Sequence, residues 1–201
     1  MSIQAVIWDV GGVIARTEDL APRDQLAQEL GVTRQRLNEL FFSGPQGTRA
    51  QKGEISIPEL MGYIRRELNL APGTYPDLRD RFFGGDRVDY DLVDTIRGLR
   101  SGYKTGIISN AWSQLPELLA SWGILDVFDA VIGSGDEGVM KPDPRIYHLA
   151  LERLDVQPSQ AVFVDDFIEN IHAARNLGMV GIHFQNRTQA LAALNSLIHR
   201  N

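Results

Sequence analysis

Several short apolar runs of the chain are followed by polar side chains that could carry out phosphoryl transfer. Carboxylates can bind a divalent cation or attack phosphorus. A lysine supplies positive charge for a phosphate, and a serine hydroxyl and backbone N–H groups supply hydrogen-bond donors. The residues with this chemistry are Asp9, Ser109 with Asn110, Lys141, and Asp165 with Asp166.

The acidic members of this set predict a metal ion. Carboxylates that lie close together repel one another unless a cation lies between them. Mg²⁺ resolves this conflict, because it prefers oxygen ligands and keeps several waters, so that it needs few carboxylates. Asp9 is followed closely by Gly11 and Gly12, whose bare backbone lets a metal ion and a substrate come near.

These residues can meet only if the apolar runs are strands of one parallel sheet. The runs are rich in apolar and β-branched residues and lack a helical period, as buried strands do. Helical patterns separate them, at 113–121, 143–154 and 168–177. This alternation indicates right-handed crossovers and an α/β fold with a Rossmann-like parallel sheet that has helices on both faces. Ligands of such a sheet bind beyond the carboxyl ends of its strands, where the polar residues stand. The expected strands are 3–8, 104–108, 130–132, 161–164 and 180–184.

One segment interrupts the alternation. Between Thr17 and about Val88 the patterns are helical, at 23–30, 33–42 and 58–68, with glycine- and proline-containing turns between them. A helical insert directly after the first strand is the arrangement of a cap. We therefore predict a Rossmann-like core formed by residues 1–16 and 89–201 and a helical cap formed by residues 17–88.

The composition excludes several classes of function. The 201 residues suffice for one sizeable core with an insert. The net charge of −6 disfavours nucleic acid as a partner, because a phosphate backbone requires a basic surface. The absence of cysteine excludes disulfides, thiolate catalysis and cysteine-ligated zinc. The N-terminal apolar run ends at Asp9, which is too short for a signal peptide or a membrane span, so a cytoplasmic location is the default expectation.

Four motifs, in their order along the chain, resemble the haloacid dehalogenase (HAD) superfamily. The resemblance spans nearly the whole chain and is closest to the phosphatase branch that has a small helical cap. The pattern around Asp9 is also similar to sugar-1-phosphate phosphatases. The motifs are Asp9-Val10-Gly11-Gly12-Val13, Ile107-Ile108-Ser109-Asn110, Lys141-Pro142-Asp143-Pro144 and Val162-Phe163-Val164-Asp165-Asp166.

The resemblance implies that Asp9 attacks phosphorus and forms an aspartyl-phosphate. Ser109, Asn110 and the backbone at Gly12 would hold the transferring phosphoryl group. Lys141 would neutralise that group and orient the nucleophile. Trp112, close to the second motif, is a candidate for the wall of the substrate pocket, with ordinary packing as its favoured role.

The same resemblance implies that Mg²⁺ is held by Asp9, the backbone carbonyl of Gly11, Asp165 and Asp166. Asn170 stands where many relatives carry another acidic residue. A direct metal-ligand role for Asn170 is therefore disfavoured, and orientation of the Asp166 region is the alternative.

Gly11 departs from the family pattern. Most phosphatases of this family carry there a second aspartate, which protonates the leaving group and then activates water. Glycine has no proton to exchange, so acid–base assistance of about 10²–10⁴-fold must come from elsewhere or be absent. Glu18 and Asp19 are candidate replacements, although a surface or hinge role is favoured for both.

The favoured hypothesis is a Mg²⁺-dependent phosphatase that acts on a small phosphorylated metabolite, with sugar phosphates as candidates. A monomer or a homodimer fits equally well, and no membrane partner is expected. One alternative is a phospholigand-binding or regulatory protein with little turnover, because Gly11 replaces the acid–base residue. The other is a haloacid dehalogenase, which the acidic pair at Asp165 and Asp166 disfavours because it would repel a carboxylate substrate.

Overall fold

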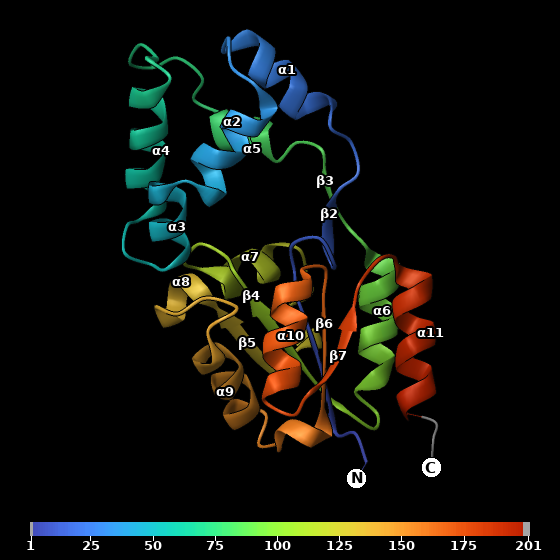
Figure 1. Cartoon of the computed structure of the whole chain (residues 1–201). Helices are drawn as coiled ribbons and strands as arrows, with labels where there is room; N and C mark the ends of the chain where they lie inside the picture. Colours follow the sequence, from blue (N-terminus) through green and yellow to red (C-terminus); the bar gives the residue numbers. More distant parts are fainter. Residues whose placement is uncertain (1, 199–201) are drawn as a thin grey trace.

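The computed structural model of the chain describes residues 2–198 (Figure 1). Five strands form one parallel sheet in the order β5-β4-β1-β6-β7. This confirms the predicted α/β fold, with each strand close to its expected position. The strands are β1 Ala5–Trp8, β4 Lys104–Ser109, β5 Ala130–Gly133, β6 Ala161–Asp165 and β7 Val180–His183.

Strand β1 lies at the centre of the sheet because it is apolar on both faces. All its residues are buried, and Trp8 is among the largest fully buried side chains. In the two parallel ladders of β1, Trp8 lies opposite Ile107 of β4 and Val164 of β6. Continued by one residue, the second register sets Asp9 beside Asp165 at the carboxyl ends of the strands.

Helices cover both faces of the sheet (Figure 1). Helices α6 (Tyr90–Leu99), α7 (Leu115–Ser121) and α11 (Arg187–Ile198) pack on one face, and α9 (Pro144–Arg153) and α10 (Ile168–Asn176) pack on the other. Helix α9 begins at its sequence signal, where the Asp143 carboxylate accepts the Arg145 N–H.

Helices α6 and α11 are absent from the sequence-based prediction. A signal for α6 was available, because Asp89 caps its N-terminus and apolar residues follow at helical spacing.

A layer of helices lies beyond the carboxyl end of the sheet (Figure 1). Its apolar side chains, among them Leu37, Phe41 and Leu60, form a cluster separate from those on the two faces of the sheet. Ser56 and Glu59 form a reciprocal capping box that starts α4. We propose that residues 17–88 act as one cap, as their helical pattern predicts. The helices are α1 Ala21–Glu29, α2 Arg34–Asn38, α3 Pro45–Gln51, α4 Ile57–Glu67 and α5 Leu78–Phe82, with a π-helical turn at Glu39–Ser43.

Two short strands, β2 (Ala15–Thr17) and β3 (Asp86–Val88), join the helical layer to the sheet. They form an antiparallel ribbon that the sequence did not predict, because each strand is too short to show a period. Just outside the ribbon, a Cβ at Gly85 would lie 1.7 Å from the carbonyl oxygen of Asp19. Only glycine therefore allows the two connections to come this close.

Among the described helices, none is long and apolar enough to cross a bilayer.

Candidate active site

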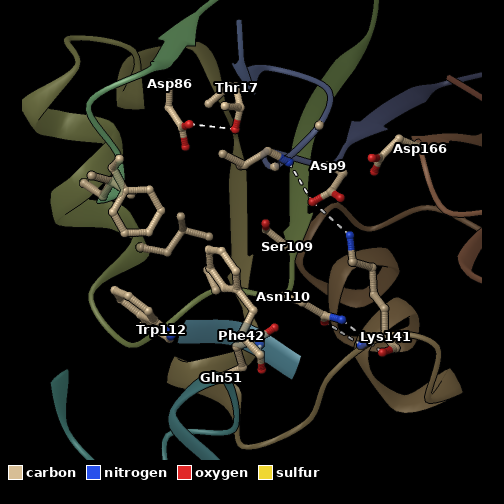
Figure 2. A pocket seen from close by; sticks show the side chains of 18 of the residues that line it. Asp9, Thr17, Phe42, Gln51, Asp86, Ser109, Asn110, Trp112, Lys141 and Asp166 are labelled. Carbon is tan, nitrogen blue, oxygen red and sulfur yellow. Dashed lines mark hydrogen bonds and ion pairs between the residues drawn. The ribbon is translucent and has the colours of Figure 1, made fainter. Parts of the chain in front are cut away.

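Lys141 lies at the centre of a buried cluster at the carboxyl end of the sheet (Figure 2). Its Nζ is 2.9 Å from Oδ1 of Asp9 and donates to Oδ2 of Asp165 at 2.6 Å and to the carbonyl of Ile108 at 3.0 Å. Burial alone would lower the pKa of Lys141, but the charges of Asp9 and Asp165 outweigh burial and raise it. All three ammonium hydrogens have acceptors, so the lysine is charged and held in one position.

Asp9 is held at the end of β1 with its carboxylate toward Lys141 (Figure 2). The Val10 N–H donates to its Oδ1 at 2.7 Å. Burial, together with the charges of Asp165 and Asp166, raises the pKa of Asp9 to about 7 against the lowering effect of Lys141. The cluster therefore carries more negative charge than Lys141 alone can balance.

Asp165 and Asp166 are neighbours in sequence but have different surroundings. Asp165 is fully buried and accepts hydrogen bonds from Lys141, from the Phe167 N–H and, with both oxygens, from Asn170. These bonds use the accepting capacity of its carboxylate. Oδ1 of Asp166 is buried and has no hydrogen-bond partner among the described residues. Burial and the charge of Asp165 raise the pKa of Asp166.

This arrangement fits a hard divalent cation. Asp9, Asp165 and Asp166 each place a carboxylate oxygen within 4.8 Å of the others. The unpartnered oxygen of Asp166 and the excess negative charge are what a bound Mg²⁺ would satisfy. Because Asp165 is already hydrogen-bonded, Asp166 and Asp9 are the members of the cluster with free capacity for a metal ion.

The two glycines after Asp9 differ in what they permit. Gly12 has φ +79°, and a Cβ there would lie 2.1 Å from Oδ2 of Asp166, so a side chain would displace that carboxylate. A Cβ at Gly11 would meet nothing within 4 Å. The position at which the family resemblance implies an acid–base aspartate is thus open space in this chain.

The two polar residues of the second motif, Ser109 and Asn110, have different places: Ser109 lies at the site, and Asn110 supports the site from outside. Ser109 ends β4, is 3% exposed and lies near Asp9 (Figure 2). The Asn110 side chain accepts the Lys141 N–H at 2.7 Å and donates to the Lys141 carbonyl at 3.0 Å. Its amide therefore fixes the Lys141 segment, so that contact of Asn110 with a phosphate stays a prediction.

Asn170 supports the site by holding the carboxylate of Asp165. Its side chain is 6% exposed and donates to Asp165 at 2.9 and 3.1 Å. The sequence predicted that Asn170 orients the Asp166 region. In the structure Asn170 orients Asp165, the neighbour of Asp166.

A cavity of about 1100 Å³ opens from this cluster. Asp9, Ser109, Lys141 and Asp166 lie at one part of its wall, and the rings of Phe42 and Trp112 lie at another (Figure 2). Trp112 thus lines the cavity, whereas ordinary packing was its favoured role. Phe42 and Phe83 were missed, because nothing in their spacing connects the helical layer with the second motif. Neither Glu18 nor Asp19 is among the described residues that line the cavity.

The fold and the site together define an α/β protein with a cluster of carboxylates and one buried lysine at the carboxyl ends of its strands. The sequence matches the haloacid dehalogenase-like hydrolase family over residues 3–178. The chain therefore belongs to the haloacid dehalogenase-like hydrolase family, as its four motifs indicate.

Named relatives and solved structures extend this comparison. The chain is 24% identical to sesquiterpene phosphatase astK of Aspergillus oryzae, covering 98% of this chain and 97% of the relative. It is 28% identical to D-ribitol-5-phosphate phosphatase of Bacteroides thetaiotaomicron, covering 96% and 100%. A HAD family enzyme of B. thetaiotaomicron in complex with magnesium and inorganic phosphate superposes with a TM-score of 0.77 at 20% identity, covering 90% of this chain and 93% of the other.

Other relatives are much longer than this chain. It is 26% identical to bifunctional epoxide hydrolase 2 of Sus scrofa over 98% of its own residues, but spans only 39% of that protein.

Proposed function

We propose that this chain is a Mg²⁺-dependent phosphatase that hydrolyses a small phosphorylated metabolite through an aspartyl-phosphate on Asp9. The observation that carries this proposal is the juxtaposition of Asp9 with Lys141 at 2.9 Å and with Asp166, whose Oδ1 has no partner among the described residues. An ionised carboxylate held by a fixed ammonium group is a nucleophile in a defined orientation. A dehalogenase would have no use for the metal-binding capacity of Asp166.

Each residue has a role that follows from its place. Asp9 attacks phosphorus, Lys141 balances charge on the nucleophile and the phosphoryl oxygens, and the Ser109 hydroxyl and nearby N–H groups hold those oxygens. Mg²⁺, when bound by Asp9, Asp166 and the Gly11 carbonyl, supplies further positive charge at the phosphoryl group. Asp165, Asn110 and Asn170 position these groups.

The leaving alkoxide takes its proton from solvent in this proposal, because Gly11 offers none. The same lack of a proton donor at Gly11 is the basis of the alternative, a phospholigand-binding protein with little turnover. The names of relatives cover different substrates, a sugar-alcohol phosphate in one and a sesquiterpene in another. Sugar phosphates therefore remain candidate substrates on sequence grounds.

The test is phosphate release from a broad panel of phosphomonoesters, with Mg²⁺ and with EDTA. We expect Mg²⁺-dependent release that Asp9→Asn abolishes. Asp77→Asn is the matched control. Asp77 is an exposed aspartate of the helical layer that precedes α5, and its side chain makes no hydrogen bond to the start of that helix. Absence of release from every ester, by a folded protein that binds Mg²⁺, would replace the phosphatase with the binding protein.

A further inference from the structure

The cavity beside the buried cluster around Lys141 has an aromatic wall that the proposed chemistry does not use. Phe42 and Trp112 stack with ring centroids 5.9 Å apart, and Phe83 packs edge-on against both, at 5.9 and 5.7 Å. Two of the rings come from the helical layer and Trp112 comes from the sheet side, just after the second motif. The rings of Phe42 and Trp112 lie across the cavity from Asp166 (Figure 2).

Apolar side chains extend this wall along the sheet side of the cavity. Val88, Leu115, Leu118 and Trp122 all line it. Leu118 is 42% exposed although it is a large hydrophobic residue on a helix that faces a cavity. Exposed apolar surface inside a ligand-sized cavity is what an apolar ligand covers.

Several polar side chains along the same cavity are already paired with protein groups. Arg23 donates to Asp86 at 2.9 Å, and the Thr17 hydroxyl donates to the same carboxylate at 2.7 Å (Figure 2). Gln51 donates to the Phe42 carbonyl at 2.8 Å, and Ser113 donates to the Gly135 carbonyl at 2.9 Å.

A sugar needs many free donors and acceptors, since each buried hydroxyl without a partner is unfavourable. On the ring wall, the indole N–H of Trp112 has no partner among the described residues, but one donor cannot serve several hydroxyls. The other polar residues that line the cavity away from the cluster around Lys141 are exposed to solvent, namely Arg79, Asp80, Arg87, Gln114, Glu117 and Glu169.

We propose that the alcohol released from the phosphate has an apolar, hydrocarbon body that lies against Phe42, Phe83 and Trp112. This inference rests on the proposed function and names its substrate class. In the reaction the bond between phosphorus and the alcohol oxygen breaks. Water supplies the hydroxyl that ends on phosphate and the proton that ends on the alcohol.

A series of 4-alkylphenyl phosphates tests this directly. Their phenol oxygens have nearly the same basicity, so only the apolar contact changes along the series. We expect kcat/KM to rise roughly fourfold for each added methylene, equivalent to about 0.8 kcal/mol, until the wall is filled. Ribitol 5-phosphate and glucose 1-phosphate are the polar comparison; because their leaving oxygens are more basic than a phenol oxygen, their KM rather than kcat/KM is compared, and it should exceed that of the longer esters.

Variants assign the effect to the wall. Trp112→Ala should flatten the dependence of kcat/KM on chain length. Tyr63→Ala should retain it, because Tyr63 is a half-buried aromatic residue of the same helical layer that does not line the cavity. If Trp112→Ala does not fold, Trp112→Gln and Val88→Thr test the same wall by polarity, and each should reduce the slope.

Failure of this inference and failure of the phosphatase proposal are distinguishable. Turnover with a flat chain-length series, or a lower KM for the sugar phosphates, overturns the apolar substrate and leaves the phosphatase intact. Absence of all turnover overturns the phosphatase. The apolar site is then tested by calorimetric titration of the same esters into the protein. Affinity that rises with alkyl chain length supports the apolar site, and affinity that stays constant overturns it.

Discussion

At the scale of single residues, the site depends on which carboxylate oxygens already have partners. Asp165 is held by Lys141, Asn170 and the Phe167 N–H, while Oδ1 of Asp166 has no partner among the described residues. The first carboxylate stabilises the protein without a ligand, and the second gains a partner only when a cation binds. Adjacent residues of the same type therefore have opposite effects on the stability of the metal-free protein.

Asn substitution at the two positions should separate these effects. In EDTA, Asp165→Asn should lower the free energy of unfolding by roughly 1.5–3 kcal/mol, because it weakens a charged hydrogen bond to buried Lys141. Asp166→Asn should leave that free energy equal or higher, because it removes a carboxylate that burial destabilises. Added Mg²⁺ should raise the melting temperature of the wild type and not that of Asp166→Asn. Equal losses for the two variants in urea unfolding would contradict this division.

Gly11 offers a gain-of-function test at the same scale. Its backbone needs no positive φ, and a Cβ would meet no atom within 4 Å, so an aspartate can be accommodated. Gly11→Asp should raise kcat by about 10²-fold, the lower end of general acid–base catalysis. Gly12→Ala is the contrasting control and should lose activity, since its Cβ would displace Asp166. Unchanged kcat in a folded Gly11→Asp protein would mean that proton transfer does not limit turnover.

At the scale of elements, Asp89 joins the ribbon to the helices of the core. It caps α6 by accepting the Leu92 N–H at 3.0 Å. It also accepts from Arg16 of β2 at 2.8 Å and from Arg187 of α11 at 2.6 Å. One carboxylate thus sets the position at which the chain enters and leaves the helical layer.

This junction should make stability sensitive to acid. Burial alone would raise the pKa of Asp89, but the hydrogen bonds from Arg16, Leu92 and Arg187 outweigh burial and lower it. The stabilisation is therefore complete above the ordinary aspartate pKa of about 4 and is lost as pH falls through the lower folded-state value. Asp89→Asn should reduce the free energy of unfolding by roughly 1–3 kcal/mol at pH 7, with the difference shrinking toward pH 3.

Urea unfolding at several pH values measures the effect of Asp89. Asp91→Asn is the control, because Asp91 also pairs with Arg187 but its side chain is 80% exposed, and little change is expected. A difference between wild type and Asp89→Asn that stays constant down to pH 3 would assign the effect to packing.

At the scale of the whole molecule, the helical layer is fastened to the sheet beside the cavity. The buried Ser134 hydroxyl donates to the Gln51 carbonyl at 2.6 Å and accepts the Ala111 N–H at 3.0 Å. The turn that follows helix α3 approaches so closely here that a Cβ at Gly53 would lie 2.1 Å from the carbonyl oxygen of Gly135. This contact lies at the wall of the cavity beside the second motif, since Gln51 and Ala111 both line the cavity.

Ser134→Ala should loosen the layer from the sheet. The Gln51 carbonyl and the Ala111 N–H would lose their partner, which destabilises the closed arrangement by about 1–3 kcal/mol. We expect faster tryptic cleavage at Arg49 and Lys52, measured by limited proteolysis without ligand. Ser121→Ala is the control, since the Ser121 hydroxyl is exposed and bonds only within its own helix. Cleavage rates that match the wild type would show that the hydroxyl does not hold the layer.

The sheet and the acidic edge could be predicted from local pattern. Buried strands of a parallel sheet are continuous apolar runs, and their carboxyl ends coincide, so residues that follow the runs meet wherever the runs lie in the chain. This is why Asp9, Ser109, Lys141 and Asp166 could be placed in one site before any contact was known. The ribbon, with strands of three residues, leaves too little pattern to detect.

Contacts between distant segments decided the rest. The spare oxygen of Asp166, the pairing of Asn110 with the Lys141 backbone and the ring wall of Phe42, Phe83 and Trp112 each require side chains from separate elements to meet. No spacing in a single sequence encodes such meetings, because they arise from how the helical layer packs over the edge of the sheet. The acidic edge is therefore a property of local sequence pattern, and the apolar cavity beside it is a property of tertiary packing.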